Sequence, residues 1–325
     1  MLESVKTVQK KQAMQRVIGD IGGTNARFAL LSENGSIHNE LVLKGADYPD
    51  FISAYKDYLV QTDCPKITEA AIAIANPING DKIKMTNHNW EFSIEEVRQG
   101  LALDRLIFRN DFAALALSIP LLKKSECHQV GGGKIKKGRP IGVLGPGTGL
   151  GVSGLIYSGK TWLPIAGEGG HVSISPTSQR ECQILDICWK TYTHVSAERL
   201  VSGSGLQKIL QALGQIDGVE IEPQLSPKEI SSRAINQTDK LCEEALDIFC
   251  GLLGTIAGNL ALTLGAKGGI YIGGGIIPKL GRFFEHSSFR QKFEGKGRFN
   301  DYLKEIPVFV IHSKHPALVG ITRAF

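Results

Sequence analysis

The chain of 325 residues has few cysteines, and no pattern joins them. They form no Cys-x-x-Cys pair and show no regular spacing, which excludes a zinc ribbon and a disulfide framework. The six cysteines lie at positions 64, 127, 182, 188, 242 and 250. We therefore expect reduced, mostly buried thiols and no structural zinc.

A secretory signal is also lacking. Residues 1–16 are polar, carry lysines and contain no apolar stretch of the kind that a signal peptide needs. We interpret residues 1–15 as a flexible N-terminal extension and expect a cytoplasmic protein.

Strong net charge is absent as well. The net charge is +5 and 21% of the residues are charged, which is ordinary for a globular protein and indicates no nucleic-acid partner. The basic run of Lys134, Lys136, Lys137 and Arg139 follows three glycines, which favours a solvated loop. A length of 325 residues suggests about two domains, and a mild positive charge can draw an anionic substrate into a cleft.

One long apolar run is present, over residues 248–266. It carries no charge and approaches the length of a membrane span. However, it contains Asn259 and glycines at 251, 254, 258 and 265. This composition favours a core helix that lies tightly against a sheet, so we expect no membrane partner.

Two glycine-rich turns carry most of the functional information. The sequences are DIGGTN at 20–25 and GPGTGLG at 145–151, each between two β-like apolar runs. Backbone N–H groups in such a bend can cradle a phosphate. One turn alone is equally typical of a hairpin that binds nothing. A pair, the first opened by Asp20, predicts two turns that hold one polyphosphate.

The predicted elements alternate between strands and helices. Three strands (16–20, 26–31, 37–43) precede a helix (48–61), a strand (69–75), a helix that starts after Ser93 and ends near Gly100, and a strand (106–109). Three further strands (140–144, 151–157 and from 162) repeat the opening, and Ser226 with Glu229 forms a capping box. The order predicts an α/β protein with an internal duplication.

Asp111 suits phosphoryl transfer, which needs a carboxylate to accept the proton of the attacking hydroxyl. It follows the apolar strand over 106–109, and the side-chain amide of Asn110 beside it can hydrogen-bond a hydroxyl group. An N-cap role at the start of the next helix is equally compatible with this spacing.

Together with TNHNW at 86–90, RNDF at 109–112, GEGGH at 167–171 and HVSAER at 194–199, these motifs resemble bacterial glucokinases of the hexokinase-like group. The resemblance runs from about Arg16 to the C-terminus. It implies the fold of sugar kinases, actin and heat-shock ATPases, with two ribonuclease H-like α/β domains and an interdomain cleft. The small domain would comprise 16–111 with 312–325, and the large domain 112–311. The cysteines do not reproduce the zinc motif of the repressor-type sugar kinases.

The resemblance implies ATP-dependent phosphorylation of D-glucose to glucose 6-phosphate, the first step of glycolysis, by a homodimer. Asp111 would be the catalytic base and Asp20 would hold Mg²⁺ through water. The implied glucose ligands are Asn110, Asp111, Glu168, His171 and Glu198. The implied ATP-binding residues are Gly19, Asp20, Ile21, Gly22, Gly23, Thr24, Asn25, Gly147, Thr148, Gly149, Gly273, Gly274 and Gly275. A kinase for another hexose and a non-catalytic sugar-sensing regulator remain alternatives.

Overall fold

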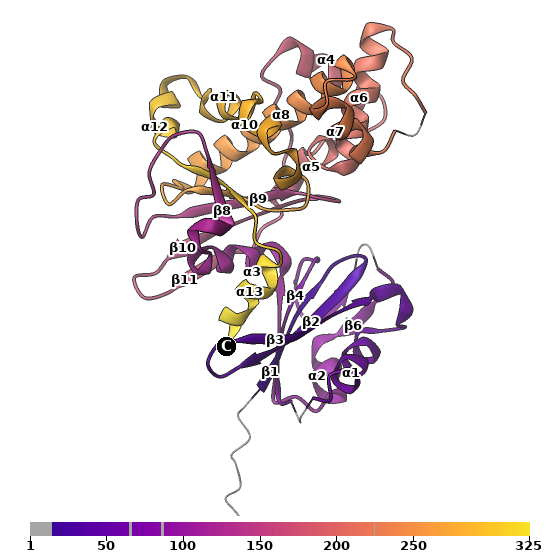
Figure 1. Ribbon diagram of the computed structural model, residues 1–325, viewed down its shortest axis with the longest axis vertical. Helices are drawn as coiled ribbons and strands as arrows, with labels where there is room; N and C mark the ends of the chain where they lie inside the picture. Colours follow the sequence, from indigo (N-terminus) through magenta and orange to yellow (C-terminus); the bar gives the residue numbers. More distant parts are fainter. Residues whose placement is uncertain (1–14, 65–66, 86–87, 224) are drawn as a thin grey trace, which may run out of the picture. The chain divides into compact units, whose positions relative to one another are not determined.

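The computed structural model describes residues 15–64, 67–85, 88–223 and 225–325 (Figure 1). The chain divides into two compact units. Unit 1 comprises Met1–Asp111 with Ile321–Phe325, and unit 2 comprises Phe112–Gly320. The predicted extension over 1–15 lies outside the described residues except for Gln15, which begins the first strand.

Unit 1 contains a five-stranded sheet in the order β3-β2-β1-β4-β7. The strands are β1 (Gln15–Ile21), β2 (Asn25–Ser32), β3 (Ile37–Lys44), β4 (Glu69–Ile74) and β7 (Arg105–Asn110). The first three strands run antiparallel to one another, whereas β4 lies parallel to β1 and β7 parallel to β4. The carboxyl ends of β1, β4 and β7 therefore share one edge.

The described residues of unit 1 include the α-helices α1 (Phe51–Gln61) and α2 (Ile94–Gly100). The helix α1 starts three residues later than predicted because Asp50 is its N-cap and accepts a 2.7 Å hydrogen bond from the Ser53 N–H. Ser93 caps α2 as expected, accepting from the Glu96 N–H at 3.1 Å. A short hairpin of β5 (Lys82–Lys84) and β6 (Glu91–Ser93) precedes α2. Buried aromatic side chains, Phe28 and Phe51 among them, join the helices to the sheet.

Unit 2 contains a six-stranded sheet in the order β11-β10-β9-β12-β13-β8. The strands are β8 (Cys127–Val130), β9 (Ile141–Pro146), β10 (Leu150–Tyr157), β11 (Trp162–Ile165), β12 (Ile270–Ile272) and β13 (Val308–Ile311). Without β8, its order and strand directions match those of the sheet in unit 1. The predicted duplication is therefore present in the sheets. Unit 1 has the α-helix α1 between β3 and β4, whereas unit 2 has several helices between the corresponding strands β11 and β12. Unit 1 also has the β5–β6 hairpin inserted after β4.

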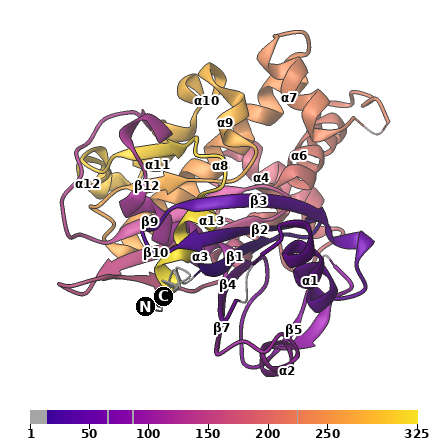
Figure 2. The same cartoon turned by 60° about the horizontal axis from the view of Figure 1, so that its bottom comes forward.

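The helices of unit 2 are drawn in Figure 2. They are α3 (Asp111–Ser118), which begins in unit 1, α4 (Gln179–Trp189), α5 (Ala197–Leu200), α6 (Gly203–Asp217), α7 (Pro227–Ile235), α8 (Lys240–Leu264), α9 (Ile277–Leu280), α10 (Arg282–His286), α11 (Phe289–Glu294), α12 (Asn300–Lys304) and α13 (Pro316–Ile321). The long helix α8 packs against α5, α6, α7, α11 and α12. The capping box of Ser226 and Glu229 starts α7 as predicted.

The helix α8 is long and apolar enough to span a membrane, but 72% of its most apolar window is buried in the protein. This burial supports the interpretation as a core helix. The glycines, however, face another helix and not the sheet. A β-carbon on Gly251 would lie 2.6 Å from Ser288 Oγ, and one on Gly258 would lie 2.6 Å from the Phe293 carbonyl oxygen. The small residues thus let α11 approach the backbone of α8.

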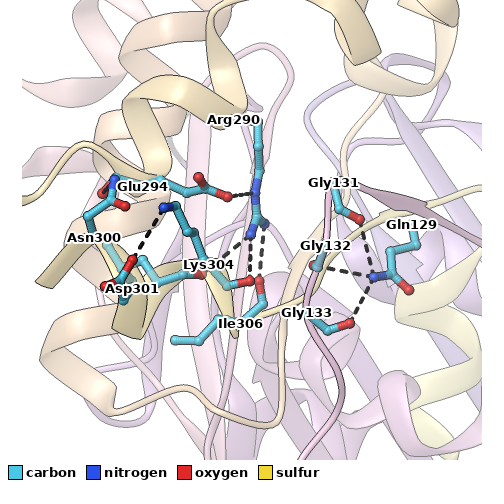
Figure 3. Close-up of polar contacts among 11 residues, drawn as sticks. Gln129, Gly131, Gly132, Gly133, Arg290, Glu294, Asn300, Asp301, Lys304 and Ile306 are labelled. Carbon is cyan, nitrogen blue, oxygen red and sulfur yellow. Dashed lines mark hydrogen bonds and ion pairs between the residues drawn. The ribbon is translucent and has the colours of Figure 1, made fainter.

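Hydrogen bonds fix the three glycines that precede the basic run of Lys134 to Arg139. The side-chain amide of Gln129 donates to the carbonyl oxygens of Gly131, Gly132 and Gly133 at 3.2–3.3 Å (Figure 3). Nearby, the Arg290 guanidinium donates to the carbonyls of Ile306 and Lys304 at 3.1 and 3.2 Å. Lys136 pairs with Glu305 at 2.8 Å while its side chain stays 48% exposed, as expected for a solvated loop.

The chain returns to unit 1 later than expected. Residues 312–320 belong to unit 2, because α13 packs on α3 with Gly320 against the Ala114 carbonyl oxygen. In unit 1, Arg105 donates to the Ala324 carbonyl at 3.1 Å, and the Arg16 guanidinium lies 4.6 Å from the centre of the Phe325 ring. All six cysteines are free, and three of them are buried.

Candidate active site

The first glycine turn joins β1 to β2 in unit 1. The Gly22 N–H donates to the Asn25 carbonyl at 2.9 Å, and the Thr24 carbonyl accepts from the Gly45 N–H at 2.9 Å. The side chains of Thr24 and Asn25 are exposed, where a ligand can reach them. Gly23 is half-buried at the centre of the turn. Gly19 and Ile21, also predicted to bind the nucleotide, lie in β1 and are buried in the core.

Asp20 lies at the end of β1 with its side chain 23% exposed. Its carboxylate is 3.5 Å from an Arg27 guanidinium nitrogen, and Arg27 also pairs with Glu40 at 3.0 Å. Burial raises the pKa of Asp20 above its usual range, and the nearby Arg27 opposes this rise only in part. The site therefore stabilises the ionised form of Asp20 less well than water does, and a cation bound beside it would oppose that effect.

Asn110 and Asp111 lie at the same sheet edge as the first turn. In the register, Ile21 pairs with Ile74 and Ile74 with Asn110, so two strand spacings, about 10 Å, separate them. Asp111 is the first residue of α3 and not the residue before it. This edge also holds the buried Asn76, which was not predicted although it follows an apolar strand.

The second and third glycine turns are neighbours in unit 2. Gly147 and Gly149 close the second turn through a 2.8 Å hydrogen bond from the Gly147 N–H to the Gly149 carbonyl, and Thr148 between them is exposed. The turn at 273–275 follows the adjacent strand β12, and the Gly273 N–H donates to the Leu144 carbonyl at 2.9 Å. Gly274, with φ of +80°, and Gly275 are exposed. The two turns thus line one edge of the sheet.

The N-terminus of α6 reaches the second turn, a contact that was not predicted from the sequence. The Gly203 N–H donates to the Gly147 carbonyl at 2.9 Å, and Ser202 is the N-cap of the helix. A serine before a helical run was the available signal. The positive end of the α6 dipole therefore lies beside the candidate phosphate turn.

Two predicted sugar ligands lie at a single 3-10 turn (Gly169–His171): Glu168 immediately precedes it and His171 is its last residue, and both are exposed. The His171 N–H donates to the Glu168 carbonyl at 3.0 Å, which closes the turn. The His194 ring donates from Nε2 to the His171 carbonyl at 3.0 Å, so His194 supports the backbone of this turn. Gly170 packs against the Leu150 carbonyl oxygen, at the start of β10.

The third predicted sugar ligand, Glu198, lies in α5 and is half-buried. Its Oε2 atom accepts a 2.9 Å hydrogen bond from the Leu150 N–H, directly after the second glycine turn. Glu168, His171 and Glu198 are therefore assembled around the same turn in unit 2.

Part of the TNHNW motif lies outside the described residues, since Thr86 and Asn87 are not among them. His88 is placed, and its ring lies 4.4 Å from that of the buried Trp90. Neither ring nitrogen of His88 has a hydrogen-bond partner within the part of the chain that the structure describes.

Within the described ranges, no group of three His, Cys, Asp or Glu side chains is arranged to hold a metal ion. A lone carboxylate such as Asp20 is an oxygen donor of the type that Mg²⁺ prefers when most of its other ligands are water and substrate phosphates. The donor set therefore fits a magnesium ion that arrives with a nucleotide.

Known proteins with similar sequences include glucokinases. The glucokinase family model matches residues 17–325. The chain is 51% identical to the glucokinase of Chromobacterium violaceum, covering 95% of this chain and 89% of that protein. It is 49% identical to the glucokinase of Aromatoleum aromaticum, covering 95% and 94%. It is also 47% identical to a bifunctional protein of Paraburkholderia xenovorans, of which it spans 48%.

Solved structures agree. A glucokinase from an Antarctic psychrotroph superposes with a TM-score of 0.86 at 32% identity, over 96% of this chain and 99% of that one. A ROK-family glucokinase from Streptomyces griseus, at 18% identity, gives a TM-score of 0.62 over 95% of this chain and 98% of that one, and this shows the shared fold alone. With its mixed α/β sugar-kinase fold, the chain belongs to the glucokinase family of enzymes.

Proposed function

We propose that this enzyme transfers the γ-phosphoryl group of ATP to the 6-hydroxyl of D-glucose, giving ADP and glucose 6-phosphate. The observation that carries the proposal is the shared edge of the sheet in unit 1. There, a glycine turn suited to phosphate and the Asn110–Asp111 pair follow β1 and β7, two strands apart. Phosphoryl transfer needs these two functions near each other.

Asp111 would accept the proton of the 6-hydroxyl while that oxygen bonds to phosphorus and the bond to ADP breaks. Its position as the first residue of α3 places the carboxylate at a strand end, the usual place for a catalytic group in an open α/β sheet. Asn110, Glu168, His171 and Glu198 would bind the other hydroxyls. A carboxylate accepts from two hydroxyls and an imidazole donates or accepts, so such a set can read sugar stereochemistry. No covalent phosphoenzyme is needed.

The phosphates would lie against the backbone of the turns at 22–25 and 147–149, with the adenosine at Gly273, Gly274 and Gly275. The buried strand residues Gly19 and Ile21 would support the first turn from below. Mg²⁺ would neutralise phosphate charge, with Asp20 as its protein contact through water. The α6 N-terminus adds a further favourable field for phosphate.

We also propose the finer assignments that the resemblance suggested. The matching strand order of the two sheets supports two ribonuclease H-like domains of the sugar kinase, actin and heat-shock ATPase type. Binding of both substrates in a cleft between the domains, a homodimer, a cytoplasmic location and a role in glycolysis rest on the family relationship.

A coupled assay tests the proposal. Purified protein with ATP, Mg²⁺ and glucose should reduce NADP⁺ through glucose-6-phosphate dehydrogenase, and a sugar panel should rank glucose above other hexoses. Light scattering of the same sample tests the dimer. Activity confined to another hexose would favour that sugar kinase, and glucose binding without turnover would favour the non-catalytic sensor.

A further inference from the structure

Leu150 is shared between the candidate sugar ligands and the candidate phosphate turn. Its N–H donates to Glu198 Oε2 at 2.9 Å, and its carbonyl oxygen lies against Gly170, between Glu168 and His171. The same residue directly follows Gly149, whose carbonyl closes the turn by accepting from the Gly147 N–H. A single hydrogen bond therefore links the Glu198 carboxylate to the residue that follows the turn.

The Glu198 carboxylate is held in this place by more than that hydrogen bond. A β-carbon on Gly149 would collide with Oε2, so the carboxylate packs directly on the α-carbon of the turn. The helix α5 is itself anchored, because the Ala197 N–H donates to the Val172 carbonyl at 2.8 Å and Ser196 caps the helix. The position of the charge is set by the backbone of unit 2.

This arrangement puts a negative charge beside a turn that is suited to phosphate. Coulomb repulsion between the Glu198 carboxylate and the phosphates weakens nucleotide binding as long as nothing screens the carboxylate. Sugar hydroxyls that donate to the carboxylate direct the positive ends of their O–H dipoles at it and so partly screen its charge from the turn. Glu168, by contrast, is exposed, and its side chain has no hydrogen-bond partner among the described residues.

We propose that Glu198 couples the two substrates: without sugar its charge weakens polyphosphate binding at the turn 147–149, and glucose bound to the carboxylate relieves this repulsion. Glu198 is then a positioning residue for the phosphate turn in addition to a sugar ligand. The proposal rests on the proposed function, and because coupling is reciprocal, nucleotide and glucose should each strengthen the binding of the other.

Calorimetric titration with Mg²⁺-AMPPNP, with and without saturating glucose, tests the coupling. In Glu198→Gln the amide oxygen can still accept the Leu150 N–H, but the charge is gone. The dissociation constant of AMPPNP without sugar should fall roughly three- to tenfold, as expected for removal of one nearby like charge. The ratio of the constants without and with glucose should shrink by a similar factor.

The matched control is Glu168→Gln. It removes the other candidate sugar carboxylate, so glucose should bind more weakly while sugar-free AMPPNP affinity stays at the wild-type value. A second measurement uses the wild type alone. The amide resonance of Leu150 should shift when glucose is added without nucleotide.

Unchanged or weaker AMPPNP binding by a folded Glu198→Gln variant would overturn the coupling, and so would an unmoved Leu150 resonance. If wild-type protein bound neither glucose nor AMPPNP, the proposed function would fail together with the coupling. If the wild type bound both ligands but Glu198→Gln bound AMPPNP no more tightly than the wild type, the coupling alone would fail.

Discussion

The α-carbon of Gly254 in α8 lies against the carbonyl oxygen of Phe289 at the start of α11, with no space for a side chain. Gly254→Ala should therefore destabilise the protein by about 1–3 kcal/mol, because overpacking outweighs the roughly 1 kcal/mol that alanine gains in a helix. Chemical denaturation with a helix-sensitive signal measures the change.

Thr263→Ala in the same helix serves as the control, since Thr263 is exposed. Its effect should stay within about 0.5 kcal/mol. Equal stability of the two variants would mean that α11 does not pack on α8 as described.

Asp111→Ala should lower kcat by about 10²- to 10⁴-fold, the usual cost of losing a general base. Glucose should still bind through Asn110, Glu168, His171 and Glu198, which calorimetry can show. Asp104→Ala, an exposed aspartate just before β7, should retain full activity. More than a tenth of wild-type activity in Asp111→Ala would remove Asp111 from the role of base.

Gly147→Val should raise the KM for ATP far more than the KM for glucose. Apart from Gly147 itself and its two chain neighbours, no atom of the described residues lies within 4 Å of a β-carbon built on Gly147. The variant should therefore fold, and its side chain should enter the space assigned to phosphate. Circular dichroism checks the fold, and steady-state kinetics with each substrate varied gives the two constants. Equal increases in both would count against a phosphate role for this turn.

Asp20→Asn should separate stability from function. Because burial raises the pKa of Asp20 in the folded protein, the native state binds the proton more tightly than the unfolded chain. Unfolding free energy is therefore lost as pH rises from the ordinary aspartate range through the raised pKa.

The Asn variant cannot ionise, so its stability should fall less over that acidic window, and its melting temperature at pH 7 should equal or exceed that of the wild type. Its activity should fall and need more Mg²⁺. Thermal melts from pH 4 to 7 and a Mg²⁺ titration test both claims. A less stable variant with unchanged Mg²⁺ dependence would contradict them.

Elements with a local signal were predictable from the sequence. Alternating apolar runs marked β1, β2 and β3, and the pairs Ser93–Glu96 and Ser226–Glu229 marked two helix starts. The start of α1 was misplaced because apolar periodicity continued through Pro49, whereas the Asp50 cap decides where the helix begins. Local chemistry therefore located most elements and some of their ends.

Relationships that depend on packing between distant segments were not predictable. The Leu150–Glu198 hydrogen bond joins residues 48 positions apart, and no sequence motif near either residue predicts it. The glycines of α8 indicated close packing, but which neighbour approached them depended on where α11 lay. The chain likewise returns to unit 1 at Ile321 and not at residue 312 because α13 packs on α3 in unit 2.

The membership of Ile321–Phe325 in unit 1 has a consequence for synthesis on the ribosome. Unit 1 is translated first, yet its contacts from Arg105 to Ala324 and from Arg16 to Phe325 require a segment that emerges after all of unit 2. Although domains generally fold in the order in which they emerge, here the second unit can be completed before the first. Pulse-labelled nascent chains that stop before residue 321 would carry a finished unit 2 and a unit 1 in which the amino ends of β1 and β7 still lack their C-terminal contacts.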